Sequence, residues 1–246
     1  MLKAVTFDLW QTLILDTPEG LRQARAERVR GMHGVLAAQG LRAQRGAVEA
    51  AYDAVGAKLE ALWASQQDVG SRGQVRMLLG VLGLEVQIPQ EGPVMDALDE
   101  AYCLPILSAL PITNAGAREV LGMLRDRGIR LALICNTGRT PGKMLRLVLD
   151  RLGIAPFLSV FTFSDEVGWR KPHPEIFSRT LTALGVMPGE AAHVGDDATT
   201  DVAGARGIGM RAVHLCHPTG VSRQSDGAFT IGQLADLPLV LFAADS

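Results

Sequence analysis

Four stretches of this sequence carry side chains that can work together on a phosphorylated ligand. Asp8 follows an apolar opening run, and small polar residues at 136–138 follow a second apolar run. Lys171 lies in a turn rich in proline, and a carboxylate pair at 196–197 ends another apolar run. Carboxylates bind divalent cations and can attack phosphorus, and a lysine balances the negative charge that they gather. The pattern therefore indicates metal-assisted phosphoryl chemistry.

A magnesium site is the first part of this prediction. Mg²⁺ is held by carboxylates and backbone carbonyls, and it keeps positions for water and for a substrate phosphate. Asp8, the carbonyl of Trp10 and Asp196 can supply such ligands. Backbone N–H groups and hydroxyls just after Cys135 can hold the phosphoryl oxygens. Asp8 can then attack phosphorus in line, which gives an aspartyl-phosphate that water cleaves.

A parallel sheet would bring these residues together. Apolar runs alternate with helical patterns in the second half of the chain, which is typical of a doubly wound, Rossmann-like α/β fold. In such a sheet the carboxyl ends of the strands meet at one crevice. We predict strands at 3–7, 129–135, 158–163, 191–194 and 210–215, and helices at 115–127, from a cap at Thr140 to 152, after Pro174 and at 199–206.

A helical insert interrupts this pattern after the first strand. Apolar side chains recur at helical spacing in four consecutive segments, and none of these segments alternates like a strand. We expect 10–16 to form a short extended element or a tight hairpin, and Pro18 suits the first turn of a helix. We predict an inserted four-helix cap domain at 17–104 and an α/β core domain at 1–16 and 105–246, with cap helices at 21–38, 48–63, 75–84 and 93–102.

The four motifs, with the sequence that flanks them, resemble the haloacid dehalogenase (HAD) superfamily with a helical cap of the first type. The resemblance covers nearly the whole chain outside the insert, and it implies a hydrolase that uses Mg²⁺. By this resemblance Asp8 is the nucleophile, Lys171 is the lysine that balances charge, and Asp196 is a metal ligand. Asp197 and Asp201 are further candidates for the metal site.

Two positions depart from the family pattern. Trp10 stands where the family's phosphatases carry a second aspartate, which is their general acid and base. An indole N–H does not exchange protons near neutral pH, and general acid–base catalysis contributes about 10²–10⁴-fold. Cys135 stands where the family has Ser or Thr, and a thiol is the weaker hydrogen-bond donor. We expect Asn136 or Thr137 to replace part of that phosphate contact.

Three functions are open on this reading. We favour a hydrolase that removes phosphate from a small phosphorylated metabolite through an Asp8-phosphate. Haloacid dehalogenases also lack the second aspartate, and they attack carbon without a metal. A carboxylate pair at 196–197 argues against that chemistry, because it would repel Asp8 unless a cation lies between them. The third function is phosphate binding or regulation with little turnover, because the residue for proton transfer is missing.

Two arginines are candidates for binding an acidic group of the substrate. Arg25 lies at the edge of the apolar stripe of the first cap helix, and Arg139 directly follows the second motif. An arginine that lays its stem over apolar surface and keeps its head in water is the commoner alternative. Asp197 can likewise cap the helix that follows it, and Trp10 can simply pack under the cap.

The composition narrows the class of protein. The chain has 246 residues, of which 48% are hydrophobic and 20% are charged, and its net charge is −2. This charge gives no electrostatic argument for nucleic acid or an anionic membrane as a partner. An acidic residue interrupts the apolar opening, so we expect no secretory signal, and three widely spaced cysteines fit a reducing compartment. We therefore expect a cytoplasmic enzyme with a small-molecule substrate.

Overall fold

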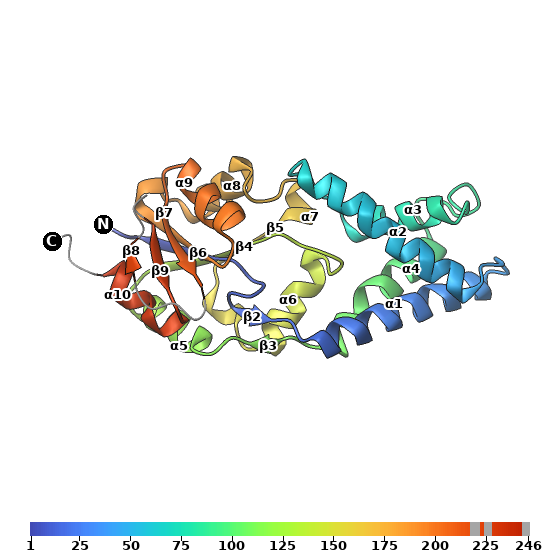
Figure 1. The fold of residues 1–246 in the computed structure, drawn as a ribbon, viewed down its shortest axis with the longest axis horizontal. Helices are drawn as coiled ribbons and strands as arrows, with labels where there is room; N and C mark the ends of the chain where they lie inside the picture. Colours follow the sequence, from blue (N-terminus) through green and yellow to red (C-terminus); the bar gives the residue numbers. More distant parts are fainter. Residues whose placement is uncertain (217–221, 224–227, 243–246) are drawn as a thin grey trace.

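The computed structural model describes residues 1–216, 222–223 and 228–242, and it is built around a seven-stranded sheet in the order β5-β4-β1-β6-β7-β9-β8 (Figure 1). All neighbours pair in parallel except β8, which is antiparallel to β9. The predicted parallel α/β sheet is confirmed. Its strands are β1 (Ala4–Phe7), β4 (Arg130–Cys135), β5 (Val160–Phe163), β6 (Ala191–Gly195), β7 (Arg211–Leu215), β8 (Ser222–Arg223) and β9 (Phe229–Ile231).

Both faces of the sheet are covered, which explains why its strands are continuous apolar runs. Along β4, Leu131 and Leu133 belong to one buried cluster, whereas Ala132 and Ile134 belong to another, as the two-residue period of a strand requires. The helices that pack here are α5 (Ala117–Asp126), α6 (Gly142–Arg151), α7 (Ser164–Val167), α8 (Pro174–Leu184), α9 (Gly204–Gly207) and α10 (Leu237–Leu241).

Four further helices extend away from the sheet at one end of the molecule (Figure 1). They bury a cluster of their own, and Met144 and Val148 of α6 join that cluster. Pro18 occupies the first turn of the first of them, after a cap in which Thr17 accepts a hydrogen bond from the Gly20 N–H. The predicted helices are present, while the domain bounds stay a prediction. They are α1 (Pro18–Ala38), α2 (Arg45–Ala64), α3 (Ser71–Val81) and α4 (Pro93–Cys103).

The chain passes between the two parts twice, and the two passages are joined. The strand β2 (Ile14–Leu15) pairs antiparallel with β3 (Ile112–Thr113), which follows the four helices. The Asn114 side chain also donates to the Thr12 carbonyl, at 2.8 Å. The extended element expected at 10–16 therefore finds its partner about a hundred residues later along the chain, rather than within a local hairpin.

Several local predictions differ from the structure. Thr140 does not cap α6, because its hydroxyl accepts from Arg28, and the Gly142 N–H donates to Asp165 instead. The helix predicted at 199–206 begins as a π-helical turn, Ala198–Ala203, and α3 starts four residues earlier than predicted. The strands β8 and β9 and the helix α10 were not predicted, and residues 217–221, 224–227 and 243–246 of the predicted core lie outside the described residues.

Short 3₁₀ turns join some of these elements, at Leu104–Leu107, Ala155–Phe157, Pro188–Glu190 and Leu234–Asp236. Across the part of the chain that the structure describes, none of the helices combines the length and the apolar character that a membrane span needs.

Candidate active site

Three carboxylates and a lysine meet where β1 and β6 end, and we call Asp8, Lys171, Asp196 and Asp201 the strand-end cluster. The Lys171 Nζ lies 2.5 Å from Asp8 Oδ1 and 2.6 Å from Asp201 Oδ1. One oxygen from each of the three carboxylates lies within 4.8 Å of the others. Because β1 and β6 are parallel neighbours, their carboxyl ends lie at the same edge of the sheet. The structure therefore brings Asp8, Lys171 and Asp196 together, and their roles in chemistry stay predictions.

The π-helical turn after β6 brings Asp201 into the cluster. Asp201 Oδ1 lies 3.1 Å from His193 Nε2, and its Oδ2 accepts from the Asp197 N–H at 3.1 Å. Gly195 permits this close approach, because a Cβ added there would lie 2.2 Å from Asp201 Cγ. The His193 ring is held in turn by Thr6, at 2.7 Å, so the carboxylate is fixed from two strands.

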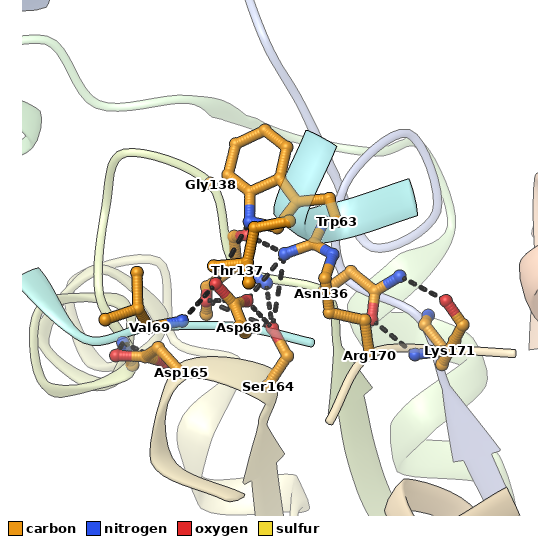
Figure 2. Close-up of polar contacts among 12 residues, drawn as sticks. Trp63, Asp68, Val69, Asn136, Thr137, Gly138, Ser164, Asp165, Arg170 and Lys171 are labelled. Carbon is orange, nitrogen blue, oxygen red and sulfur yellow. Dashed lines mark hydrogen bonds and ion pairs between the residues drawn. The ribbon is translucent and has the colours of Figure 1, made fainter. Parts of the chain in front are cut away.

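Asn136 fixes the backbone of Lys171. The Asn136 Nδ2 donates to the Lys171 carbonyl at 3.0 Å, and the Lys171 N–H donates to Asn136 Oδ1 at 2.7 Å (Figure 2). The amide group of Asn136 therefore links the end of β4 to the loop that carries the lysine. Its predicted contact with phosphate stays a prediction, and the structure adds this second role.

Burial and charge shift the pKa values of the strand-end cluster in opposite directions. Burial, supported by the charges of Asp201 and Asp196, raises the pKa of Asp8 to about 7, although Lys171 opposes this. Burial alone would lower the pKa of Lys171, but its two carboxylate partners outweigh burial and raise it. The same lysine holds the pKa of Asp201 below its usual range against burial. The cluster thus keeps a protonated lysine among three acids.

A second polar cluster joins the helices to the sheet, and we call Asp68, Thr137, Ser164 and Arg170 the cap–core contact. Asp68 lies in the loop between α2 and α3, with its side chain fully buried. Its Oδ2 accepts from Ser164 Oγ at 2.5 Å, from Arg170 at 2.6 Å and from Thr137 Oγ1 at 3.2 Å (Figure 2). Its Oδ1 accepts from the Trp63 indole N–H, at 3.0 Å, and from the backbone N–H of Val69, at 2.8 Å.

Backbone hydrogen bonds strengthen the cap–core contact. The Asp68 N–H donates to the Gly168 carbonyl at 3.1 Å, and the Arg170 N–H donates to the Gln66 carbonyl at 2.8 Å. The Arg170 guanidinium also lies over the Trp63 ring, 4.4 Å from its centroid. The loop that carries Lys171 is therefore tied to the α2–α3 loop immediately before the lysine itself. No local pattern predicts this contact, because the side chains that bind Asp68 across it are 69 to 102 residues away.

A cavity of about 380 Å³ lies between the four helices and the strand ends. Trp10, Asn136 and Thr137 line it from the sheet side, and Arg25 and Arg28 line it from α1. This volume is typical of a site for a small molecule. The strand-end cluster supplies groups for chemistry, and the cavity supplies space for a substrate.

The sequence model of one family matches most of the chain. Described as haloacid dehalogenase-like hydrolase, it covers residues 2–209. The chain belongs to the haloacid dehalogenase-like hydrolases. The resemblance seen in the four motifs is confirmed, and the protein is a hydrolase.

Two relatives of this hydrolase are phosphatases. A phosphoserine phosphatase of Thermus thermophilus is 34% identical over 232 residues, which are 86% of this chain and 88% of the relative. A glyceraldehyde 3-phosphate phosphatase of Pyrococcus abyssi is 43% identical over 98 residues, and there the chain spans only 40% of the relative's length.

Solved structures share the fold of this hydrolase. A HAD phosphatase from Thermococcus onnurineus aligns with a TM-score of 0.61 at 24% identity, over 98% of both chains. A 2-haloacid dehalogenase from Pseudomonas syringae aligns with a TM-score of 0.66 at 23% identity, also over 98% of both chains. These two alignments show a common fold for proteins with different reactions.

The remaining candidate residues of the hydrolase lie in different surroundings. Asp197 caps the π-helical turn by accepting from the N–H groups of Thr199 and Thr200, at 2.8 and 2.7 Å, and it is not one of the three converging acids. Cys135 is fully buried, and burial raises its pKa well above the usual value, so it is a thiol rather than a thiolate. Its predicted contact with phosphate, like the metal role of Asp197, stays a prediction.

Two candidates line the cavity but are engaged elsewhere. The Arg25 guanidinium pairs with Glu49 and Asp53, both at 2.7 Å. Thr137 lines the cavity too, but its N–H and its hydroxyl bind Ser164 and Asp68. The predicted phosphate contact by Thr137 therefore requires its hydroxyl to exchange Asp68 for a phosphoryl oxygen.

Trp10 joins the two parts of the hydrolase. Its side chain packs against the buried cluster of the sheet and also against that of the four helices, and it lines the cavity. The packing alternative for Trp10 is thus supported, and the residue lies beside the space where a substrate would bind. Arg28, which sequence reasoning passed over, lines the same cavity. Its position in the apolar stripe of α1, between Ala24 and Met32, was the available signal.

Proposed function

We propose that this protein is a Mg²⁺-dependent phosphatase that acts on a small phosphorylated metabolite through an Asp8-phosphate. The observation that carries the proposal is the convergence of Asp8, Asp196 and Asp201, two of which pair with Lys171. The phosphatase relatives support the same reaction. A cytoplasmic location stays a prediction.

The residues present fit a magnesium ion. The donor atoms of the converging carboxylates are all oxygens, which is the ligand type that Mg²⁺ prefers. Burial lowers the pKa of His193, so its imidazole adds no charge, and the lysine alone does not neutralise three acids. Asp8, Asp196 and the carbonyl of Trp10 would hold the ion. Bound there, it would offset the negative charge of the carboxylates and of a phosphoryl group.

Each residue of the strand-end cluster has a separate task in this reaction. An oxygen of Asp8 attacks phosphorus while the bond to the ester oxygen breaks, and water then cleaves the aspartyl-phosphate and regenerates the carboxylate. Lys171 stabilises the negative charge on the phosphoryl oxygens, and Asp201 holds the lysine in place. Trp10 cannot give a proton to the leaving oxygen. We therefore expect slow turnover of esters whose alcohol is a poor leaving group.

Phosphatase chemistry fits the cluster better than dehalogenation. The attacking carboxylate and the two others beside it would repel an anionic haloacid in a site without a divalent cation. Asp196 favours the phosphatase, because one of its carboxylate oxygens lies within 4.8 Å of ligand oxygens of Asp8 and Asp201.

The test measures phosphate and halide release in parallel. The proposal expects release of inorganic phosphate from a panel of small phosphate esters that depends on Mg²⁺ and stops with a chelator. Asp8→Asn should lower it by at least about 10³-fold, as removal of a nucleophile does. Asp126→Asn, an exposed aspartate on α5, is the control and should keep normal activity.

Two other results would contradict the phosphatase proposal and favour a different function. Halide release from 2-chloropropionate that survives the chelator would identify a dehalogenase. Binding of phosphate or of a phosphate mimic at Asp8, without turnover of any ester on the panel, would identify a binding or regulatory protein.

A further inference from the structure

The cavity contains two guanidinium groups for which the described residues provide no negatively charged partner. Arg28 and Arg139 both line it. Within residues 1–216, 222–223 and 228–242, neither forms an ion pair with a carboxylate, and all their hydrogen bonds go to neutral groups. Burying a cation without an anion costs free energy, so the position of these two arginines calls for a physical explanation.

Arg28 is the more deeply placed of the two, with 5% of its surface exposed. Its Nε donates to the Tyr102 carbonyl at 2.9 Å, and its Nη2 donates to Thr140 Oγ1 at 2.8 Å. Its Nη1 has no partner among the described residues, yet it is not among the fully buried unpaired atoms. This nitrogen therefore keeps some exposed surface, in a residue that lines the cavity.

Arg139 reaches the same tyrosine from the core side. Its Nη1 donates to the Tyr102 hydroxyl at 3.1 Å, its Nη2 donates to the Tyr52 carbonyl at 3.0 Å, and the group lies 4.2 Å from the Tyr52 ring centroid. Burial raises the pKa of Tyr102 to about 12, so its hydroxyl stays neutral and offsets neither cation. Tyr102 thus holds both arginines in fixed positions without neutralising them.

The other charged groups of the cavity wall do not neutralise Arg28 or Arg139. Arg25 and Arg170 also line the cavity, but each is paired with carboxylates of the helical part. Asp16 is the acidic residue of the lining, and within the described residues it pairs with none of these arginines. Burial raises the pKa of Asp16, which favours its uncharged form.

We propose that Arg28 and Arg139 bind a second anionic group of the substrate, separate from the phosphoryl group that Asp8 attacks. A carboxylate or a second phosphate has the required chemistry, because a planar guanidinium binds either through paired N–H donors. The inference rests on the proposed phosphatase function, and it narrows the substrate to a phosphate ester that carries a further anion on a short carbon chain. The cavity is of a size for such a molecule.

The experiment compares three ligands that share a two-carbon chain: ethyl phosphate, 2-phosphoglycolate and ethylene glycol bisphosphate. Their affinities are measured by calorimetry with Mg²⁺ on the Asp8→Asn protein, which cannot turn them over. We expect the two ligands with a second anion to bind about 10–100-fold more tightly than ethyl phosphate, as charged hydrogen bonds allow. The tighter of the two shows whether a carboxylate or a phosphate is preferred.

Variants at the two arginines test the assignment. Arg28→Gln and Arg139→Gln, each added to Asp8→Asn, should reduce the affinity ratio to ethyl phosphate by about 10-fold. Arg30→Gln makes the same chemical change on an exposed position of α1 and should leave the ratio as it was. Circular dichroism checks that each variant is folded. If Arg28→Gln does not fold, the Arg139→Gln variant, at a half-buried position, is the one that tests the proposal.

The results separate this inference from the proposed function. Equal affinities for all three ligands, or a ratio that folded Arg28→Gln or Arg139→Gln proteins retain, would overturn the second anion site. Phosphate release from the wild-type protein is a separate measurement. If release occurs while the affinities are equal, only the second anion site fails, and if no ester is hydrolysed while the ratio persists and falls in the variants, only the phosphatase proposal fails.

Discussion

At the ends of β1 and β6, three carboxylates converge and two of them pair with one lysine. In the cavity, by contrast, the guanidinium groups of Arg28 and Arg139 pair with no carboxylate of the described residues. The two regions are adjacent, since Trp10 and Asn136 line the cavity beside the strand ends. Acidic groups outnumber the lysine in the strand-end cluster, and arginines outnumber the single acid in the cavity lining. The strand-end cluster suits a cation, and the cavity suits an anion.

The two regions also differ in which elements position their charged groups. The carboxylates come from the ends of neighbouring parallel strands, so the sheet fixes their spacing with little freedom. The arginines come from a helix and a loop that meet only when the two parts of the chain pack together. In the proposed reaction, the sheet therefore positions the reacting groups, and the helices with their loops select the second anion of the substrate.

The largest effect on stability is expected from Lys171→Met. The substitution leaves two buried carboxylates without their cation, which costs about 3–5 kcal/mol in the free energy of unfolding. Urea denaturation at neutral pH measures it, and phosphate release should be lost. Lys3→Met, which removes an exposed pair with Glu190, should cost no more than about 1 kcal/mol. Equal losses of unfolding free energy in the two variants would contradict the prediction, because the buried lysine would then stabilise the fold no more than the exposed one.

A smaller loss is expected from Asp68→Ala. It removes the acceptor for Arg170, Ser164 and Thr137, and the stranded donors cost about 2–4 kcal/mol. The matched control is Asp96→Ala, because Asp96 also pairs with an arginine but at an exposed site, where pairs contribute at most about 1 kcal/mol. Chemical denaturation of both variants gives the difference. A loss for Asp68→Ala that does not exceed the control would mean that the cap–core contact adds nothing to stability.

The smallest effect concerns pH. Asp165 accepts from the Gly142 N–H, and its pKa is raised from 3.8 to about 6, first by burial and then by Glu166 and Asp68. A raised pKa means that the protonated form favours the fold, so this contribution is full below about pH 4 and is lost as the pH rises through 6. Asp165→Asn should remove that decline. Urea midpoints of both proteins from pH 4 to 8 measure it, and parallel profiles would contradict the assignment.

Sequence reasoning was strongest where local pattern and topology agree. Apolar runs that end in Asp8 and Asp196 predicted strands, and the parallel order of such strands placed both carboxylates at one edge. It was weakest at the ends of elements. At the start of the helix after Thr140, the Gly142 N–H donates to Asp165, which α7 supplies, and no local propensity encodes a neighbour 23 residues away.

The sequence by itself determined the family, the alternating sheet and the acids and lysine of the strand-end cluster, because residue types at strand ends are constrained by chemistry and by the two-residue period of a strand. Only the tertiary structure decided that Asp68 ties the helices to the sheet, and that Arg28 and Arg139 line one cavity without a negative partner in the part of the chain that the structure describes. Whether a charge is compensated depends on groups that folding brings together from distant positions, so a sequence shows the charge but not its partners.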